Sequence, residues 1–360
     1  MRTRTEGRER NVTLSTATER VGRPKVIRSV LSLAVVIVIF AGVLPRIADL
    51  SEVRATLVDM TWLEVLTLVA VAGWNLITYW LLLMATLPGL GWVQAMVVTE
   101  ASTAVANTLP GGQAFGVGIT YSMFTSWGFR PSVVASSLVV SGVADLFAKL
   151  SLPLIALVVL AVGAETNPAL ITASVVGAAV LGGAVVVFAV ALKSARSAQL
   201  VGEWLASAAS VFLRFFGRRP VSGWGESAAA WRAETVELLR GGWWKVLGAA
   251  LLSHASLFAV LLIALRHVGV PEAEVSWGEA LGAFAVARLL TALPVTPGGL
   301  GVIELGLVGA LAVAGGDEVP VVAAVLVFRA LTYLAQIPFG AITYLVWRHN
   351  TAWRRGPENE

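Results

Sequence analysis

The sequence predicts an all-α integral membrane protein with about six long transmembrane helices and two re-entrant, broken helical hairpins in an inverted repeat. Its composition is the first reason. The chain has 57% hydrophobic and 13% charged residues, whereas soluble domains carry about 45–50% apolar and about 25% charged residues. The second reason is that the apolar residues form blocks of about 20, the length that crosses roughly 30 Å of hydrocarbon. The third is a proline-glycine break that occurs twice.

The chain begins with a basic tail, residues 1–28, which carries eight Arg or Lys residues. It has no apolar periodicity, so we expect it to be disordered and cytoplasmic. The first apolar run ends at Pro45 without a small-residue cleavage site, so we interpret it as a retained helix and not as a signal peptide.

A polytopic membrane domain, residues 29–347, follows the tail. Its long spans are predicted at 27–44, 62–85, 131–162, 168–192, 243–265 and 320–347. With the N-terminus inside, the loop 193–242 and the C-terminal tail 348–360 are cytoplasmic, and both are rich in Lys and Arg. The opposite loops are mostly acidic, as the positive-inside rule predicts. We therefore expect a multi-pass plasma-membrane protein with both termini in the cytoplasm.

The loop 193–242 contains an amphipathic helix, predicted from Leu200 to Phe216. Large apolar residues such as Trp204 and Phe212 share one face, opposite Glu203 and Ser207. This pattern predicts a helix in the membrane interface. It serves either as a simple connector or as a site for lipid sensing or partner docking.

Two apolar stretches, 92–127 and 277–315, are interrupted and define the repeats, about 61–163 and 243–347. The breaks are Leu109-Pro110-Gly111-Gly112 and Thr296-Pro297-Gly298-Gly299. Each pair of pieces either dips into the membrane and returns or crosses it twice. Because the two stretches start from opposite sides, they are typical of a transporter's central site. The helix N-terminus after each break would direct partial positive charge at an anion.

Six ionisable residues lie inside apolar blocks, where each costs roughly 2.5 to 3.5 kcal/mol on insertion scales. They are Glu100, Asp145, Lys149, Arg288, Glu304 and Arg329. Asp145 and Lys149 are four residues apart and are expected to form a structural ion pair. We expect Arg288 and Arg329 to converge on Glu304 around the second break and form a phosphate-binding pocket. Tyr333 either adds a hydroxyl there or simply packs.

Several function classes are excluded. The chain has no cysteine and three scattered histidines, so we expect no disulfide, metal or cofactor. Its basic residues flank the apolar blocks, which argues against nucleic-acid binding. The glycine-rich break lacks a P-loop lysine, and Ser253 with His254 has no evident orienting acid. We therefore do not expect an enzyme.

The second break lies in the run ALPVTPGGLGVIE, from Ala292 to Glu304. With Arg329 and Tyr333, this run resembles the C-terminal signature of the flippase-like membrane region of lysylphosphatidylglycerol synthases. The N-terminal signature of that family is similar to residues of the first half, which are Asn107, Leu109, Pro110, Gly111, Gly112 and Asp145. The resemblance covers about residues 30–347.

The resemblance implies a stand-alone membrane domain that moves aminoacylated phospholipids or related lipid-linked molecules between leaflets. Two departures matter. Family members often carry an acidic residue and arginines where this chain has Ala114, Phe115, Ser141 and Gly142, so we expect the first half-site to recognise its ligand differently. The aminoacyl-transferase domain is also expected to be absent, so the chain should not make lysylphosphatidylglycerol alone.

The functional hypothesis is a translocase for an anionic or aminoacylated phospholipid or a polyprenyl-linked lipid. The alternative is a non-transporting membrane subunit or regulator of a lipid synthase or glycosyltransferase, which would then be its protein partner. The predicted substrate-binding residues are Asn107, Pro110, Gly111, Gly112, Asp145, Arg288, Pro297, Gly298, Gly299, Glu304, Arg329 and Tyr333.

Overall fold

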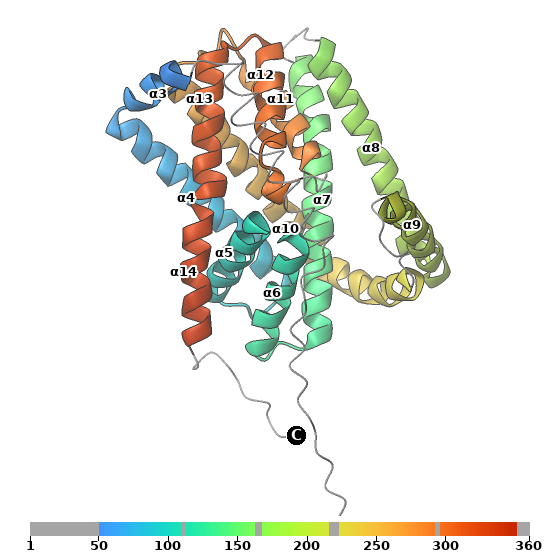
Figure 1. Ribbon diagram of the computed structural model, residues 1–360. Coiled ribbons are helices and arrows are strands. Elements are labelled where there is room, and N and C mark those ends of the chain that lie inside the picture. The colour runs from blue at the N-terminus through green and yellow to red at the C-terminus, as the bar shows by residue number, and fades with distance from the viewer. Residues whose placement is uncertain (1–49, 110–111, 163–167, 216–222, 292–295, 351–360) are drawn as a thin grey trace, which may run out of the picture.

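The computed structural model describes residues 50–109, 112–162, 168–215, 223–291 and 296–350 (Figure 1). Within these residues the regular structure is entirely helical, which confirms the predicted fold class. Five helical segments are long and apolar enough to cross a membrane, namely Trp62–Thr86, Pro131–Val162, Ile171–Lys193, Gly242–His267 and Glu318–His349. They coincide with five of the predicted spans. The remaining one, 27–44, lies outside the described residues.

Helix α4 (Trp62–Thr86) follows the short helix α3 (Leu50–Val58), and its start is fixed by a capping box. The Thr61 amide donates to the Glu64 carboxylate over 2.7 Å, and Thr61 in turn accepts from the Glu64 amide. Helix α11 (Trp277–Leu290) begins with the same arrangement at Ser276 and Glu279. These caps satisfy amides that would otherwise lack partners at the helix starts.

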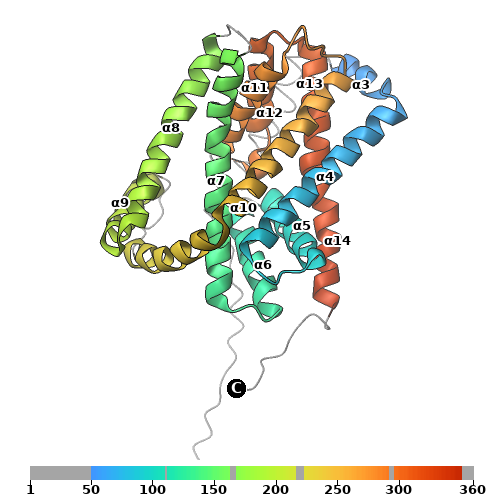
Figure 2. The same cartoon turned by 180° about the vertical axis from the view of Figure 1, so that it is seen from behind.

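The two interrupted stretches form pairs of short helices. The first pair is α5 (Trp92–Thr108) and α6 (Gly112–Ser126), and the second is α11 and α12 (Val302–Ala314). The longest of them, α5, has 17 residues and therefore spans only about 25 Å at 1.5 Å per residue, less than the hydrocarbon thickness. Figures 1 and 2 show the two pairs at opposite ends of the bundle. Each pair therefore enters the bundle and returns toward the end from which it came, and the two pairs do so from opposite ends.

Long helices α7 (Pro131–Val162) and α8 (Pro168–Lys193) follow the first hairpin. After the second hairpin, α13 (Glu318–Arg329) and α14 (Gln336–His349) form one span joined by a π-helical turn, η3 (Ala330–Leu334). There the Ala335 amide donates to the Ala330 carbonyl over 2.9 Å. Pro338 lacks an amide, and its ring would clash with the carbonyl one turn earlier, so the wider turn beside it relieves that conflict.

The loop 193–242 folds into α9 (Ala195–Phe215) and the first part of α10 (Trp224–His267), which stand beside the bundle. The span predicted from the apolar residues begins only at Trp243. The structure has one 44-residue helix that bends at Gly242, where the backbone leaves helical values. Small residues of α9, namely Ala198, Gly202 and Ala206, are buried, and Gly202 lies close to the backbone of α10.

Each hairpin belongs to its own packed core. Buried residues of α11 and α12, such as Phe284 and Leu307, pack in one cluster with α10 and α13. Buried residues of α5 and α6, such as Val98 and Phe124, pack in a second cluster with α4. The hairpins are therefore firmly supported, and both of their breaks point inward to the same region.

Candidate functional site

A cavity of about 710 Å³ lies between the two breaks and is lined by residues from both hairpins. Gly112 and Gln113 reach it from the first hairpin, and Gly298 and Gly299 from the second. Small-molecule sites usually measure about 300 to 1,000 Å³. The cavity is therefore large enough for a lipid headgroup, and irregular backbone at this depth requires such a polar space.

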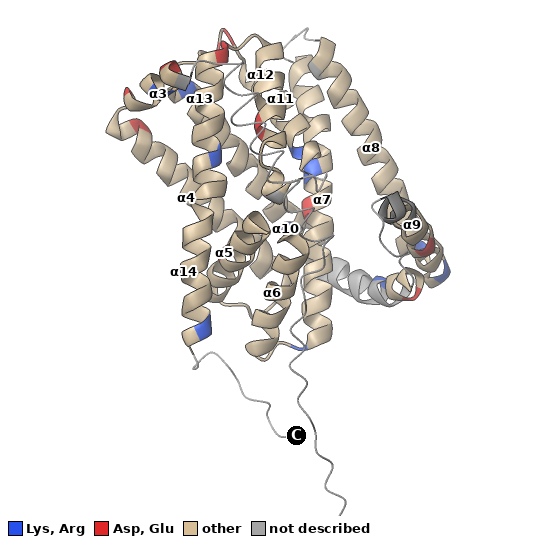
Figure 3. Cartoon of the chain, viewed as in Figure 1, with Lys and Arg blue, Asp and Glu red and all other residues tan. Residues whose placement is uncertain are grey.

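Charged residues gather around this cavity although the surrounding helices are apolar. Figure 3 shows acidic and basic residues about half-way along the bundle on α7, α12 and α13, whereas the remaining charges concentrate near the ends and on α9 and α10. Asp145, Lys149, Arg288 and Arg329 line the cavity. Such charges inside a membrane domain usually mark a functional site or an ion pair. The contacts of each group show which of them have an ion-pair partner.

The backbone of the second break depends on glycine. The turn η2 (Pro297–Gly299) contains Gly298 with φ 57° and Gly299 with φ 70°, and Gly301 follows with φ 81°. These left-handed conformations are accessible to glycine at little cost. A Cβ atom on Gly298 would also overlap the ring of Tyr333. The PGG motif is therefore required both by the turn and by the close approach of Tyr333.

Glu304 and Arg329 form the ion pair that holds this break in place. The Arg329 Nε donates to Glu304 Oε1 over 2.6 Å, and its Nη2 donates to the Gly298 carbonyl over 3.1 Å. The other Glu304 oxygen accepts from the Gly301 amide at 2.6 Å. Their predicted proximity is confirmed. However, Glu304 also caps its own helix, so this amide of the N-terminus of α12 is not left for an anion.

Tyr333 connects the second break to the first. Its hydroxyl donates to the Asn107 carbonyl over 2.6 Å, and the Arg329 guanidinium lies 4.3 Å from the centre of its ring. The predicted grouping of Asn107 with Tyr333 is thus present, although the hydrogen bond is to the backbone of Asn107. Pro110 and Gly111, also predicted here, lie outside the described residues.

Arg288 does not join this group, which corrects the prediction that both arginines converge on Glu304. It lies on α11 and faces α7 and α10, where its Nη2 is 3.4 Å from His254 Nε2. Its buried Nε has no hydrogen-bond partner, and no carboxylate of the described residues lies within 4.0 Å of its guanidinium. The two arginines line one cavity from separate places because Arg288 precedes the break, whereas Glu304 follows it.

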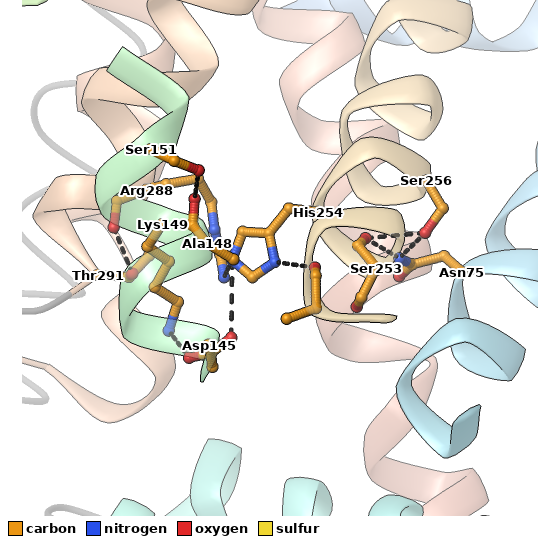
Figure 4. Close-up of polar contacts among 11 residues, drawn as sticks. Asn75, Asp145, Ala148, Lys149, Ser151, Ser253, His254, Ser256, Arg288 and Thr291 are labelled. Carbon is orange, nitrogen blue, oxygen red and sulfur yellow. Dashed lines mark hydrogen bonds and ion pairs between the residues drawn. The ribbon is translucent and has the colours of Figure 1, made fainter. Parts of the chain in front are cut away.

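The neighbours of Arg288 form a second polar cluster (Figure 4). The predicted pair is confirmed, since Lys149 Nζ lies 2.6 Å from Asp145 Oδ2. Asp145 Oδ1 is 3.6 Å from His254 Nε2, and His254 Nδ1 is 3.1 Å from the Ala250 carbonyl. A carbonyl oxygen can only accept, so Nδ1 is the donor in this contact. In the neutral form of His254, Nε2 then carries no hydrogen and is an acceptor that faces Arg288.

His254 is the member of this cluster that sequence reasoning missed. In the sequence its visible feature is the neighbouring Ser253, and this pair has no evident orienting acid. In the structure the two residues face different helices, since the Ser253 carbonyl accepts from Asn75 of α4 over 3.1 Å and the His254 ring faces α7 and α11. The available signal was an imidazole in the middle of an apolar span, where ionisable groups face the bundle interior.

Comparison with known proteins agrees with this architecture. Residues 27–340 match the family model described as the lysylphosphatidylglycerol synthase TM region. The chain belongs to this family. A relative is a UPF0104 membrane protein of Methanocaldococcus jannaschii, which is 36% identical over 74 residues. That match covers 21% of this chain and 31% of the relative, so less than a third of the relative's length is matched. Membership of the lysylphosphatidylglycerol synthase TM-region family confirms the resemblance found in the break motifs.

Proposed function

We propose that this chain is a lipid translocase, in which the headgroup passes through the cavity between the two breaks. The observation that carries the proposal is the environment of Arg288: its guanidinium lines the cavity, no carboxylate of the described residues lies within 4.0 Å of it, and its Nε has no hydrogen-bond partner among them. The oxygens of a lipid phosphate would accept hydrogen bonds from the N–H groups of this guanidinium. The substrate class is therefore an anionic or aminoacylated phospholipid, or a polyprenyl-linked lipid.

The opposed hairpins support the same proposal. In transporters built from inverted repeats, the substrate site lies between discontinuous helices, and one repeat moves against the other to change its access. Here Tyr333 of the last span contacts Asn107 at the first break, so a movement of either half would change the shape of the cavity. No nucleotide site is evident in the sequence, so movement would be downhill or coupled to an ion gradient.

The test is lipid exchange in liposomes that contain the purified full-length chain and a fluorescent phosphatidylglycerol. A membrane-impermeant quencher should extinguish the inner-leaflet label faster when the protein is present. Arg288→Gln should slow this exchange by roughly 10- to 100-fold, since hydrogen bonds to charged groups contribute about 1.5 to 3 kcal/mol. Arg54→Gln, on the exposed surface of α3, is the matched control and should exchange normally.

Two results would count against the proposal. If no labelled phospholipid or polyprenyl-linked lipid exchanges faster in the presence of the protein, translocation is wrong. If Arg288→Gln exchanges lipid at the wild-type rate, the protein translocates by a route that does not use this pocket.

A specific observation also favours the second candidate function, a non-transporting subunit or regulator of a lipid synthase or glycosyltransferase. Helix α9 exposes Leu200, Trp204 and Leu205 beside the bundle. Replacing these three residues by serine distinguishes lipid translocation from the regulatory role. Loss of a co-purifying enzyme with unchanged lipid exchange would favour the regulatory role.

We also infer that the protein lies in the plasma membrane with both termini in the cytoplasm, as its basic segments indicate. Because the chain has no cysteine, single cysteines report the orientation directly. A cysteine at Asp59, before α4, should react with an impermeant thiol reagent on intact cells. A cysteine at Gln199, on α9, should react only after the cells are opened, and the reverse pattern would invert the topology.

A further inference from the structure

Glu100 is a buried carboxyl group that the proposed binding site does not use. It lies on α5, is 1% exposed and borders the cavity. Its Oε1 accepts a hydrogen bond from Trp80 Nε1 over 2.8 Å, whereas its Oε2 is buried and has no hydrogen-bond partner in the part of the chain that the structure describes. Its carbonyl is in close contact with Gly340 of α14, so the residue is held firmly in place.

Glu100 differs from the other carboxylates inside the bundle. Asp145 has Lys149 and Glu304 has Arg329, but no cation of the described chain lies within 4.0 Å of Glu100. A buried carboxylate without a counter-ion is costly, and the usual remedy is to bind a proton. The protonated group would also turn the unsatisfied Oε2 into a hydroxyl donor at the cavity wall.

Among the described residues, the helices packed against α5 place no cation within 4.0 Å of this carboxylate. Helix α4 contributes the Trp80 donor, and its Tyr79 lines the same cavity. The titratable group of α6 is Tyr121, which is exposed, and the charged groups of α14 are Arg348 and His349, exposed in its last turn. The second break, η2, has no titratable side chain. The remaining titratable groups of the cavity are Asp145, Lys149, Arg288, Arg329 and Tyr333.

We propose that Glu100 is a proton-binding site whose occupancy is linked to headgroup binding in the cavity. Apart from the two ion pairs, the described residues that line the cavity include one unpaired cation, Arg288, and one unpaired anion, Glu100. An anionic headgroup therefore meets a neutral site when Glu100 is ionised and a site of net charge +1 when Glu100 carries a proton. The proton comes from water, binds the carboxylate oxygen and returns to water when the headgroup leaves.

This linkage rests on the proposed function, because it needs an anion to bind beside Arg288. Linkage is reciprocal, so proton uptake strengthens headgroup binding and headgroup binding strengthens proton uptake. A pH difference across the membrane could then drive the lipid in one direction. This supplies a candidate energy source for a chain whose sequence shows no nucleotide site.

The first experiment tests the proton site without requiring transport. Infrared difference spectra of the purified full-length protein, recorded during a pH titration, should show a protonated-carboxyl band that is lost as the pH rises. The band should be missing in Glu100→Gln and retained in Glu52→Gln, a control on exposed α3. If Glu100→Gln gives the same spectra as the wild type, Glu100 takes up no proton and the proposal is overturned.

The second experiment measures binding of short-chain phosphatidylglycerol as a function of pH. Wild-type affinity should weaken with rising pH, by at most about tenfold per unit because one proton is linked. Glu100→Gln should bind the lipid at every pH with the affinity that the wild type shows at low pH. If both proteins show the same pH dependence, or if affinity follows sodium concentration instead of pH, the linkage is wrong. If neither protein binds at any pH, the proposed function fails, and the infrared titration alone decides on the proton site.

Discussion

Arg329 and Arg288 line the same cavity but are held in different ways. Arg329 has an ion pair with Glu304, a hydrogen bond to the Gly298 carbonyl and a stacking contact with Tyr333. Arg288 has a long contact with His254 and a side-chain contact with Tyr79, and its Nε has no hydrogen-bond partner among the described residues. The difference shows that a charge in hydrocarbon is not by itself a binding group. Arg329 holds the break in place through these contacts, whereas Arg288 has no carboxylate partner among the described residues and is the group that we propose binds the headgroup.

The largest effect should come from breaking the Arg329 pair. Arg329→Gln leaves the buried Glu304 without its counter-ion, so we expect a loss of about 3 to 5 kcal/mol in the free energy of unfolding. Chemical denaturation in detergent micelles measures this loss. The double variant Arg329→Gln with Glu304→Gln removes both charges and should recover much of the stability. A double variant as unstable as the single one would contradict the ion-pair explanation.

A smaller effect is expected at the contact between the two breaks. Tyr333→Phe keeps the ring beside Arg329 but leaves the Asn107 carbonyl without its donor. We expect a loss of about 1 to 3 kcal/mol, the usual cost of an unsatisfied buried group. Tyr344→Phe, on α14, is the control and should be nearly neutral. Equal unfolding free energies for the two variants would mean that the Tyr333 hydroxyl does not hold the breaks together.

Arg288→Gln should change stability least, although it should slow lipid exchange most. It removes a part-buried cation that has no ion pair among the described residues, so we expect a smaller loss in the free energy of unfolding than for Arg329→Gln or Tyr333→Phe. The same denaturation experiment checks this. A loss as large as that of Arg329→Gln would show that the two arginines are both structural.

We expect the cavity that the two arginines share to be open to water. A cysteine at Gln113, which lines the cavity, should react with small aqueous thiol reagents. A cysteine at Ala101, which is fully buried on α5, should not. Inertness at both positions in the folded protein would indicate a dry hairpin and remove the basis for the contrast.

The sequence was most informative where interactions are local. Apolar blocks set the spans, the Pro-Gly motifs set the breaks, and the four-residue spacing predicted the Asp145–Lys149 pair. It was less informative across helices, because the partner of a charge then depends on how helices pack. Arg288 and Glu304 are only 16 residues apart by their numbers, yet the break directs them to different neighbours. The bend at Gly242 was also not predictable, because the chain has 35 glycines and the sequence does not show which of them bends a helix.

The π-helical turn at Ala330–Leu334 makes the last span sensitive to length as well as to composition. This turn contains one residue more than an α-helical turn would need. Deleting one residue there would rotate α14 by about 100° relative to α13. Gly340 would then leave the Glu100 carbonyl, and a residue with a larger side chain would turn toward it. We therefore expect many side-chain replacements in this turn to be tolerated, whereas any change in the number of residues between Arg329 and Gly340 should separate the last span from the first hairpin.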